Sequence, residues 1–453
     1  MAGKQDDWNK EIIDMTNLFG TDGIRARIGT CPLQPHELIQ LGHAIAQWII
    51  TTYGTHSSCI IGTDSRESGD CISALLKSSL LQYQLQIFDV GVLPTPAFLY
   101  YVQNHPYISC ALIISASHNR YHDNGIKIVD ATGKLSLQAE QEISLLTHTA
   151  NKDNKFGTHF GSSTYLIDAQ QEYASMLQQK ATAISLPNKK IIIDCANGAT
   201  SAIASAIVQA TGSQVIALNC SPNGRNINDE CGSTNIHALQ NAMSFYKADI
   251  GFSFDGDGDR IGVVSSNGTV LNGDDILVLL AQNRTYAQQS AIVGTIMSNQ
   301  GLQVWLNARN QELVRTNVGD KNIANAMKEH QLLLGGEPSG HILMGDYMPM
   351  SDGIATALQI LQTLTITNNW DLETFQKFPQ FSKNIPVKEK KNLEQEPIAP
   401  LIAATKNRLP NGRLVVRYSG TESLLRIMAE GEHAQETENI VSQLSEQLYR
   451  LLN

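Results

Sequence analysis

One pattern recurs three times along the chain and limits the folds open to it. A short run rich in β-branched residues ends in small or turn-forming residues, and a helical stretch follows. The three runs are residues 59–62, 191–194 and 291–294. Buried strands that lead into helices through such turns are typical of α/β units with partly parallel sheets. Since the runs lie roughly one hundred residues apart, we expect three α/β domains of ordinary size.

The pattern changes in the last part of the chain. Residues 413–417 and 424–428 look like two strands around a polar loop. From residue 432 to 452 the pattern is that of an amphipathic helix, with four apolar side chains on one side: Ile440, Leu444, Leu448 and Leu451. The predicted fold class is therefore α/β, with three similar α/β domains with mixed sheets and a smaller C-terminal α+β domain.

The composition is that of a globular protein with several domains. At 453 residues the chain is too long for one hydrophobic core, and 42% of the residues are hydrophobic against 17% charged. The formal net charge of −10 argues against a general affinity for nucleic acid or an anionic membrane.

Targeting and cysteine signals point to the cytoplasm. No run approaches the ~20 apolar residues of a membrane span, and the N-terminus lacks the apolar region of a secretory signal. The seven cysteines are scattered and never spaced as CxxC, which argues against a disulfide framework or a zinc site. We therefore expect a cytoplasmic protein without a membrane or nucleic-acid partner.

The strongest local signal is an alternation of aspartate and glycine after the strand-like residues 248–253. Asp255, Asp257 and Asp259 can curl so that their carboxylates converge, and such hard oxygens suit Mg²⁺. Arg260 offers a phosphate partner beside the ion. An EF-hand loop would need Gly at its sixth position and Glu at its twelfth, where this chain has Arg260 and Ser266. A solvated Asp/Gly turn remains the alternative.

A second signal lies where the apolar residues 111–114 run into Ser115, Ala116, Ser117, His118 and Asn119. Strand ends of this kind are where α/β proteins place reactive groups. A serine here is a candidate nucleophile or phosphate carrier, while an ordinary turn is the other interpretation. No G-x-S-x-G motif supports a serine hydrolase of the usual kind.

Residues 335–341 place a carboxylate, a hydroxyl and an imidazole close together in Glu337, Ser339 and His341. Such a set suits ligands rich in hydroxyl groups, such as sugars. A tight surface turn explains the same spacing equally well.

Residues 417–423 combine small residues with charge. Small residues leave backbone N–H groups free and arginines supply charge-assisted hydrogen bonds, which together favour a phosphate cradle. Arginine at the edge of a solvated strand is the alternative. The candidate residues are Arg417, Ser419, Gly420, Thr421 and Arg426.

Together these segments resemble the motifs of the α-D-phosphohexomutase family. The resemblance runs from Phe19 to about Gly431, in the order of the family. Smaller features resemble the branch that acts on glucosamine phosphates more than the mannose branch: residues 114–119, 123–127, 194–198 and 231–234. The five motifs are similar to the opening motif (19–25), the phosphoserine loop (115–119), the metal loop (255–260), the sugar-specificity loop (336–341) and the phosphate loop (417–421).

The resemblance implies four domains around a central cleft, each contributing one loop. We expect a phosphoserine-loop domain at 1–160 and a metal-binding-loop domain at 161–268. A sugar-binding-loop domain at 269–382 and a phosphate-binding domain at 383–453 would follow. Boundaries near the polar stretch 151–161 and the charged segment 387–392 fit this division.

The resemblance also implies roles for individual residues. Ser117 would carry the phosphoryl group as phosphoserine, and Mg²⁺ would be held by Asp255, Asp257, Asp259 and an oxygen of that phosphoserine. Lys127 and His341 resemble the acid–base residues of the family, with Arg25 beside them and His118 as a further catalytic candidate. The expected substrate-binding residues are Arg260, Glu337, Ser339, Arg417, Ser419, Gly420, Thr421 and Arg426.

The implied reaction interconverts glucosamine 6-phosphate and glucosamine 1-phosphate through a 1,6-bisphosphate, for UDP-N-acetylglucosamine and cell-wall synthesis. Glucosamine 1,6-bisphosphate or glucose 1,6-bisphosphate would be the activator, and a homodimer is the assembly considered. A lysine can act as the base if neighbouring cations depress its pKa.

The chain departs from the usual pattern of the family at several positions. Arg120 stands where proline is usual and adds a cation near Ser117, and stronger phosphate binding or a tuned phosphorylation of Ser117 are the effects considered. Pro338 replaces the glutamine of the glucosamine branch, which keeps mannose or glucose phosphates as alternative substrates. A catalytically lapsed phosphosugar-binding protein and a Ser–His hydrolase are the other hypotheses. The remaining departures are Ala26, Lys321, Tyr418 and Ser423.

Overall fold

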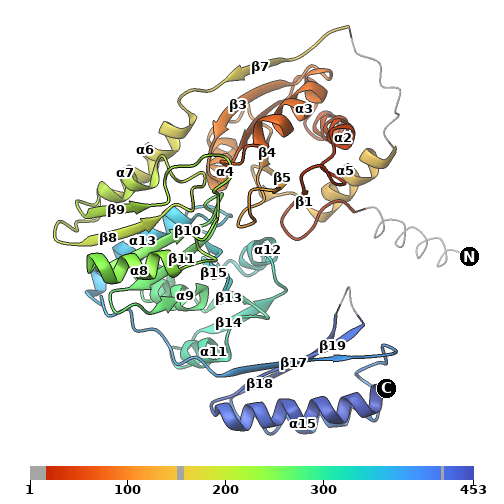
Figure 1. Cartoon of the computed structure of the whole chain (residues 1–453), viewed down its shortest axis with the longest axis vertical. Coiled ribbons are helices and arrows are strands. Elements are labelled where there is room, and N and C mark those ends of the chain that lie inside the picture. The colour runs from red at the N-terminus through yellow and green to blue at the C-terminus, as the bar shows by residue number, and fades with distance from the viewer. Residues whose placement is uncertain (1–16, 150–157, 420–422) are drawn as a thin grey trace, which may run out of the picture. The chain divides into compact units, whose positions relative to one another are not determined.

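The computed structural model describes residues 17–149, 158–419 and 423–453, whose elements are labelled in Figure 1. The chain forms two compact units. The first unit comprises Met1–Gln288 and Thr316–Glu373, and the second comprises Gln289–Arg315 and Thr374–Asn453. The predicted domain boundaries stay predictions, and residues 151–157 of the expected first boundary lie outside the described residues.

The first sheet of the first unit is mixed. Its order is β1-β5-β4-β2-β3-β7, with β6 paired to β5. Strand β2 pairs in parallel with β3 and β4, whereas β5 runs antiparallel to β4 and β1. Every residue of β2 and β4 is buried, as is usual for strands covered on both faces. The strands are β1 (Ile24–Arg27), β2 (Ser58–Thr63), β3 (Gln86–Val92), β4 (Cys110–Ile114), β5 (Asp123–Asp130), β6 (Gly133–Lys134) and β7 (Ser162–Tyr165).

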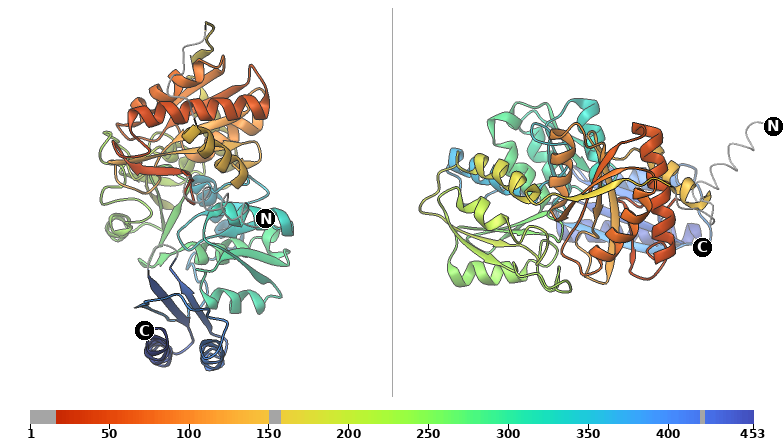
Figure 2. Two further views of the ribbon diagram at one scale, coloured as in Figure 1. Left: turned by 90° about the vertical axis from the view of Figure 1, so that its right-hand side faces the viewer. Right: turned by 90° about the horizontal axis from the view of Figure 1, so that it is seen from above.

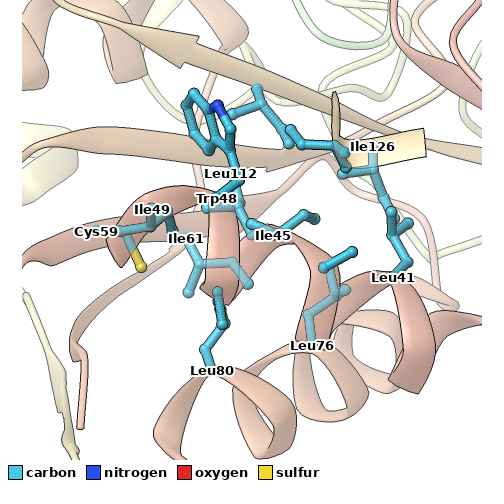
Figure 3. Close-up of a cluster of buried hydrophobic side chains, with 14 of the residues drawn as sticks. Leu41, Ile45, Trp48, Ile49, Cys59, Ile61, Leu76, Leu80, Leu112 and Ile126 are labelled. Carbon is cyan, nitrogen blue, oxygen red and sulfur yellow. The ribbon is translucent and has the colours of Figure 1, made fainter. Parts of the chain in front are cut away.

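An apolar core joins this sheet to its helices. Figure 3 shows Leu41 and Ile45 of one helix and Leu76 of the next beside Ile61 of β2 and Leu112 of β4. This packing fixes the position of β2 and β4, at whose carboxyl ends the candidate site begins. The helices of this part are α2 (Pro35–Tyr53), α3 (Gly69–Leu81), α4 (Thr95–Asn104) and α5 (Leu137–Thr149).

The second sheet of the first unit has the order β12-β11-β10-β8-β9. Strand β10 pairs in parallel with β8 and antiparallel with β11, so the β10–β11 connection is a hairpin loop at one end of the sheet. That loop carries the three aspartates of the predicted metal site. The elements are α6 (Ala169–Ala181), β8 (Lys190–Asp194), α7 (Ala204–Gln209), β9 (Gln214–Leu218), α8 (His237–Tyr246), β10 (Ile250–Phe254), β11 (Ile261–Ser265) and β12 (Val270–Leu271).

The last part of the first unit carries the predicted sugar loop. Strands β15 and β16 pair antiparallel and enclose residues 337–341. Gly273 begins the neighbouring helix, and a Cβ there would lie 1.7 Å from the carbonyl oxygen of Glu337, so only glycine allows this approach. The elements are α9 (Gly273–Ala281), α10 (Arg284–Ala287), α12 (Asp320–His330), β15 (Leu334–Gly336), β16 (Ile342–Met344) and α13 (Gly353–Thr367).

In the second unit, strands β17, β19 and β18 form an antiparallel sheet that packs against α15, as Figure 2 shows for the blue part of the chain. Ile440, Leu444 and Leu448 of α15 are buried in the core, as the apolar spacing predicted. The elements are β13 (Ala291–Thr295), α11 (Gln300–Asn307), β14 (Glu312–Thr316), β17 (Gln380–Pro386), α14 (Ile398–Lys406), β18 (Arg413–Tyr418), β19 (Leu424–Glu430) and α15 (Ala434–Leu452).

The structure confirms the recurring pattern of the sequence. The three predicted runs are β2, β8 and β13, and the next helices are α3, α7 and α11. The predicted C-terminal helix begins at Ala434. Among the described residues, none of the helices has the length and apolar character that crossing a membrane requires.

Candidate active site

Ser117 lies just beyond the carboxyl end of β4 and points at the aspartate loop. Its Oγ donates a hydrogen bond to Oδ2 of Asp255 at 2.7 Å, and the serine is fully buried. Its backbone is in the left-handed region with φ of 51°, which costs a residue with a side chain about 1–2 kcal/mol. The backbone N–H of Ser117 donates to Oγ of Ser115 at 2.9 Å. The local fold therefore aims this hydroxyl at the loop between β10 and β11.

Asp255, Asp257 and Asp259 converge in that loop. Ligand oxygens of the three lie within 4.8 Å of one another, and each residue is at most 1% exposed. Oδ1 of Asp257 is buried and makes no hydrogen bond within the described part of the chain. Buried carboxylates this close need a cation nearby. The hard oxygens and the orphaned acceptor fit Mg²⁺, as the sequence predicted.

The charges of the triad are compensated unevenly. Burial, together with the charges of Asp259 and Asp257, raises the pKa of Asp255 to about 7. Burial acts in the same sense on Asp259, but Lys127 and His341 outweigh it and hold the pKa of Asp259 well below its usual range. On the side next to Ser117 the nearest cation is Arg260, whose Nε lies 3.8 Å from Oδ2 of Asp255, so Asp255 is compensated less closely than Asp259.

Lys127, on β5, is surrounded by carboxylates. Its Nζ lies 2.9 Å from oxygens of Asp22, Asp257 and Asp259. Burial lowers the pKa of Lys127, but these three charges outweigh it and raise the pKa well above its usual value. The depressed pKa that a lysine base requires is therefore not found, because the groups closest to Nζ are anions. In this arrangement Lys127 is an ammonium that can bind a phosphate oxygen, and its raised pKa makes it a weaker proton donor than a free lysine.

Arg25 lies beside Lys127 because their strands are neighbours. Arg25 on β1 is paired in register with Gly125 of β5. Asp22 accepts hydrogen bonds from Arg25 and Lys134 and also contacts Lys127. Nε of Arg25 is buried and has no hydrogen-bond partner among the residues described. Asp22 therefore connects three cations, two of which were predicted site residues.

His341 lies between two carboxylates. Its Nδ1 is 2.9 Å from Oε2 of Glu337 and its Nε2 is 3.1 Å from Oδ1 of Asp259. Burial lowers the pKa of His341, but Asp259 and Glu337 outweigh it and raise the pKa to about 10. Nε of Arg260 lies 3.1 Å from Nε2 of His341. The two carboxylates favour the protonated ring, whereas the charge of Arg260 opposes it, and His341 is a candidate for proton transfer.

Glu337, in the sugar loop, is oriented by a backbone N–H group. Oε1 of Glu337 accepts a hydrogen bond from the backbone N–H of Gly319 at 2.8 Å. Oγ of Ser339 lies 3.4 Å from Oε2 of Glu337, and Ser339 is exposed. The loop thus offers a fixed carboxylate and an accessible hydroxyl.

His118 follows Ser117 directly but holds its hydroxyl less closely than Asp255 does. Nδ1 of His118 is 3.5 Å from Oγ of Ser117. Burial, followed by the charges of Arg260 and Arg25, lowers the pKa of His118 to about 4. The imidazole is therefore neutral at neutral pH. The short hydrogen bond from Ser117 to Asp255 is not the geometry that a Ser–His hydrolase needs.

The predicted phosphate residues lie in the second unit. Arg417 of β18 and Arg426 of β19 are directly opposite each other, and both line a cavity of about 230 Å³. Like charges placed opposite on neighbouring strands repel unless an anion lies between them. Ser419 is buried, and its Oγ accepts a hydrogen bond from Nη2 of Arg426 at 3.4 Å. The other two predicted residues, Gly420 and Thr421, lie outside the described residues.

Known protein families match most of the chain. Four models named for phosphoglucomutase/phosphomannomutase match: α/β/α domain I over residues 16–154, domain II over 171–268, domain III over 272–380 and the C-terminal domain over 383–447. A protein named phosphoglucosamine mutase from Maricaulis maris is 39% identical over 425 residues, which cover 91% of this chain and 94% of that protein. The chain belongs to the phosphoglucomutase/phosphomannomutase family. It is therefore an enzyme of the isomerase class that moves phosphoryl groups.

Solved structures share the fold of this phosphohexomutase. A phosphoglucomutase/phosphomannomutase family protein from Burkholderia thailandensis has a TM-score of 0.78 at 20% identity and covers 96% of this chain and 97% of its own. N-acetylphosphoglucosamine mutase from Aspergillus fumigatus, solved in complex with GlcNAc-6P and magnesium, has a TM-score of 0.63 at 16% identity and 96% coverage of each chain.

The structure shows where the charge of Arg120 lies in this phosphohexomutase. Arg120 does not direct its charge at Ser117: its guanidinium lies 2.9 Å from Oε1 of Glu230 and 3.6 Å from Oδ1 of Asp229. The side chain of Arg120 is 58% exposed and turns toward this acidic pair because two carboxylates there attract it.

Within the first unit the structure brings together eleven predicted residues: Arg25, Ser117, His118, Lys127, Asp255, Asp257, Asp259, Arg260, Glu337, Ser339 and His341. Sequence reasoning missed four residues that contact them: Asp22, Arg66, Thr95 and Asn228. Asp22 stood within the opening motif and Arg66 stood directly after β2, so both carried a signal. Thr95, whose Oγ1 donates to Asp257 at 2.6 Å, and Asn228 carried none.

Proposed function

We propose that this phosphohexomutase interconverts glucosamine 6-phosphate and glucosamine 1-phosphate by means of a phosphoryl group carried on Ser117. The observation that carries the proposal is the buried Oγ of Ser117, 2.7 Å from Asp255 of the aspartate triad. The name of the Maricaulis maris relative and the GlcNAc-6P bound by the Aspergillus fumigatus protein support an amino-sugar substrate. The product would supply UDP-N-acetylglucosamine and cell-wall synthesis.

The triad is the proposed magnesium site. Asp255, Asp257 and Asp259 would hold Mg²⁺ together with an oxygen of the phosphoserine, since their carboxylates converge next to Ser117. When bound, Mg²⁺ supplies positive charge that offsets the charge on the transferring phosphoryl group. The magnesium in the Aspergillus fumigatus structure supports this choice of metal.

The proposed reaction has two phosphoryl transfers. In the first, the bond between phosphorus and Oγ of Ser117 breaks while a hydroxyl oxygen of the bound sugar monophosphate bonds to phosphorus, which gives a 1,6-bisphosphate. In the second, the other phosphoryl group of the turned bisphosphate returns to Oγ. In each transfer the attacking hydroxyl loses a proton and the leaving oxygen gains one, so that after both transfers Ser117 again carries a phosphoryl group.

Two side chains are the proposed proton donors. His341 lies between Glu337 and Asp259, which favour its protonated ring, and Lys127 is an ammonium beside Asp257 and Asp259. Both can donate to a leaving oxygen and recover the proton in the reverse direction, Lys127 more weakly because its pKa is raised. Arg25, next to Lys127, and the neutral His118, next to Ser117, complete the proposed catalytic group.

The remaining residues are proposed to bind substrate. Arg417, Ser419, Gly420, Thr421 and Arg426 would hold the phosphate that does not react. A phosphate cradle of this kind accepts the substrate in either orientation, because it contacts phosphate rather than sugar. Glu337 and Ser339 would contact sugar hydroxyls, and Arg260 would contact phosphate.

Mass spectrometry tests the central claim. The enzyme is incubated with Mg²⁺ and glucose 1,6-bisphosphate, its intact mass is measured, and the phosphopeptide is mapped. We expect one phosphoryl group on Ser117, with neither phosphorylation nor turnover in Ser117→Ala. Ser78→Ala, at an exposed serine of α3, is the matched control and should retain both. A phosphoryl group on another residue, or turnover by Ser117→Ala at the normal rate, would contradict the proposal.

A second substrate class is favoured by one feature. Pro338 lies between Glu337 and Ser339 in the sugar loop, where the glucosamine branch usually has glutamine. A coupled assay with Mg²⁺ and each sugar phosphate separates the two. Higher kcat/KM for mannose or glucose phosphates than for glucosamine phosphates would favour the second class. No turnover of any of these sugar phosphates would favour the hypothesis of a catalytically lapsed phosphosugar-binding protein.

Three further proposals concern the setting of the enzyme. We place it in the cytoplasm, with glucosamine 1,6-bisphosphate or glucose 1,6-bisphosphate as its activator and a homodimer as its assembly. Dependence of the initial rate on added bisphosphate tests the activator. Light scattering after size-exclusion chromatography tests the dimer, and a monomeric mass at working concentration would contradict it.

A further inference from the structure

Two side chains hold the backbone of the Ser117 loop without touching the reacting hydroxyl. The first is Arg66, directly beyond the carboxyl end of β2. Its Nη2 donates to the carbonyl oxygen of Ser117 at 2.9 Å, and its Nη1 donates to those of Asn119 and Arg120, each at 3.0 Å. One guanidinium therefore binds three carbonyl groups of one loop.

Arg66 is itself fixed in place. It is 3% exposed, and its Nε lies 3.1 Å from Oδ2 of Asp64. The same Oδ2 accepts a hydrogen bond from Oγ of Ser115 at 2.6 Å, and that Oγ accepts from the N–H of Ser117. The buried carboxylate of Asp64 therefore acts on both sides of Ser117. It reaches the N–H of Ser117 through Ser115 and the carbonyl oxygen of Ser117 through Arg66.

The second side chain is Asn228, which comes from the segment that follows β9. Its Nδ2 donates to the carbonyl oxygens of Ser117 and Asn119, each at 2.9 Å. Asn228 is 7% exposed, and its own N–H donates to the carbonyl oxygen of Ala196 at 2.9 Å. The carbonyl oxygen of Ser117 therefore has two donors, from loops that follow strands of two different sheets.

This attachment meets a requirement of the Ser117 backbone. A left-handed residue with a side chain persists only where its surroundings hold it, and such strain gathers at functional sites. The hydrogen bonds to its carbonyl oxygen fix the orientation of the peptide that follows Ser117, and with it the loop from which Oγ reaches Asp255. A misplacement of about 1 Å can slow a reaction on the order of 100-fold.

We infer that Arg66 and Asn228 are positioning residues that clamp the carbonyl group of Ser117 and thereby hold its Oγ against Asp255. The inference rests on the proposed function, because it gives the clamp its purpose: to keep the phosphate carrier aligned for both transfers. It goes further in assigning this task to two residues outside the catalytic and substrate-binding groups.

Single-turnover kinetics test the clamp. The rate of Ser117 phosphorylation by glucose 1,6-bisphosphate with Mg²⁺ is measured for Asn228→Ala and for Asn228→Asp, which keeps the shape but loses the donor. We expect the rate and kcat to fall roughly 10- to 100-fold. KM for the sugar phosphate should change less than about twofold, because the clamp does not touch substrate.

Arg225→Ala is the matched control. Nε of Arg225 donates to Oε2 of Glu67 at 2.7 Å, so this pair also joins the segment after β9 to the segment after β2, and in the described part of the chain its side chains form no hydrogen bond or ion pair with residues 115–119. We expect a normal phosphorylation rate in this variant. Arg66→Lys, which keeps the charge beside Asp64, is the second test and should be slowed at least as much as Asn228→Ala.

The outcomes separate the clamp from the proposed function. A wild-type enzyme that carries no phosphoryl group on Ser117 would overturn the proposed function, and the clamp with it. Normal wild-type phosphorylation with an unchanged rate in both Asn228 variants and Arg66→Lys would overturn the clamp alone. Equal slowing in Arg225→Ala and Asn228→Ala, with a raised KM in both, would show general loosening of the two segments and would also overturn the clamp.

Discussion

The Oγ of Ser117 lies 2.7 Å from Oδ2 of Asp255, although 138 positions separate the two residues along the chain. Each residue lies in a loop that follows a strand, β4 for Ser117 and β10 for Asp255, and the two strands belong to different sheets of the first unit. Both residues are fully buried. Gly256 makes the approach possible, since a Cβ there would lie 2.7 Å from the carbonyl oxygen of Ser117. The phosphate carrier and the proposed metal loop are therefore joined directly, and substitutions at this contact should affect metal binding and stability differently.

Asp255→Asn should separate stability from activity. The substitution removes one of three buried carboxylates within 4.8 Å of one another, so it relieves repulsion in the absence of Mg²⁺. We expect a higher midpoint of thermal unfolding in EDTA, and mutase turnover reduced by about 1,000-fold or more. The rise in unfolding temperature that Mg²⁺ gives the wild type should disappear, because the ligand no longer stabilises the folded state.

Asp249→Asn is the control for that variant. Asp249 precedes the same strand, β10, but it is not part of the triad. Its Oδ1 pairs with Nζ of Lys189 at a distance of 2.9 Å. It should keep the Mg²⁺-dependent gain in unfolding temperature and normal turnover. A full Mg²⁺ response in Asp255→Asn would rule out Asp255 as a ligand.

Asp22→Asn should damage both folding and catalysis. Asp22 contacts the buried Lys127 and the half-buried Arg25 and Lys134, and removal of its charge leaves these cations with less compensation. We expect a loss of about 3 kcal/mol in the free energy of unfolding by urea and a fall in kcat on the order of 100-fold. Asp89→Asn breaks a more exposed pair with Lys77 and should cost about 1 kcal/mol or less. Equal losses in the two variants would contradict the role given to Asp22.

Much of the fold and part of the site could be predicted from local patterns. The runs that became β2, β8 and β13 were readable because fully buried strands leave an apolar signature followed by a turn. Ser117 and the triad were predicted because their loops follow such strands directly. These residues carry their signal in the sequence next to them.

The remainder depends on contacts between distant segments. Thr95 donates to Asp257 across 162 positions, and Lys134 contacts Asp22 across 112. Nothing near Thr95 in the sequence indicates that partner. The raised pKa of Lys127 was unpredictable for the same reason, since two of its carboxylate neighbours, Asp257 and Asp259, come from the other sheet.

Arg120→Pro, which restores the residue usual in the family, should leave the enzyme almost unchanged. Arg120 and Glu230 form an ion pair at 2.9 Å with side chains 58% and 75% exposed, and pairs of this kind contribute little. A double-mutant cycle between Arg120→Ala and Glu230→Ala should give a coupling free energy of about 0.2–1 kcal/mol in urea unfolding. The phosphorylation rate of Ser117 in Arg120→Pro should stay within about twofold of the wild type, since the guanidinium points away from it. A tenfold slower rate would show that Arg120 acts on Ser117.

His43 should make stability depend on pH in the acidic range. The side chain is buried in α2 beside the ring of Tyr83, and burial lowers the pKa of His43. Because the folded state disfavours the imidazolium, this contribution to stability is present above the unfolded pKa of about 6.5 and is lost as the pH falls through the lower folded value. His43→Leu should therefore gain stability relative to the wild type in urea unfolding as the pH falls below about 6.5. His36→Leu, at an exposed histidine of the same helix, should follow the wild-type curve. A constant difference between His43→Leu and the wild type over this range would show that His43 does not change its charge there.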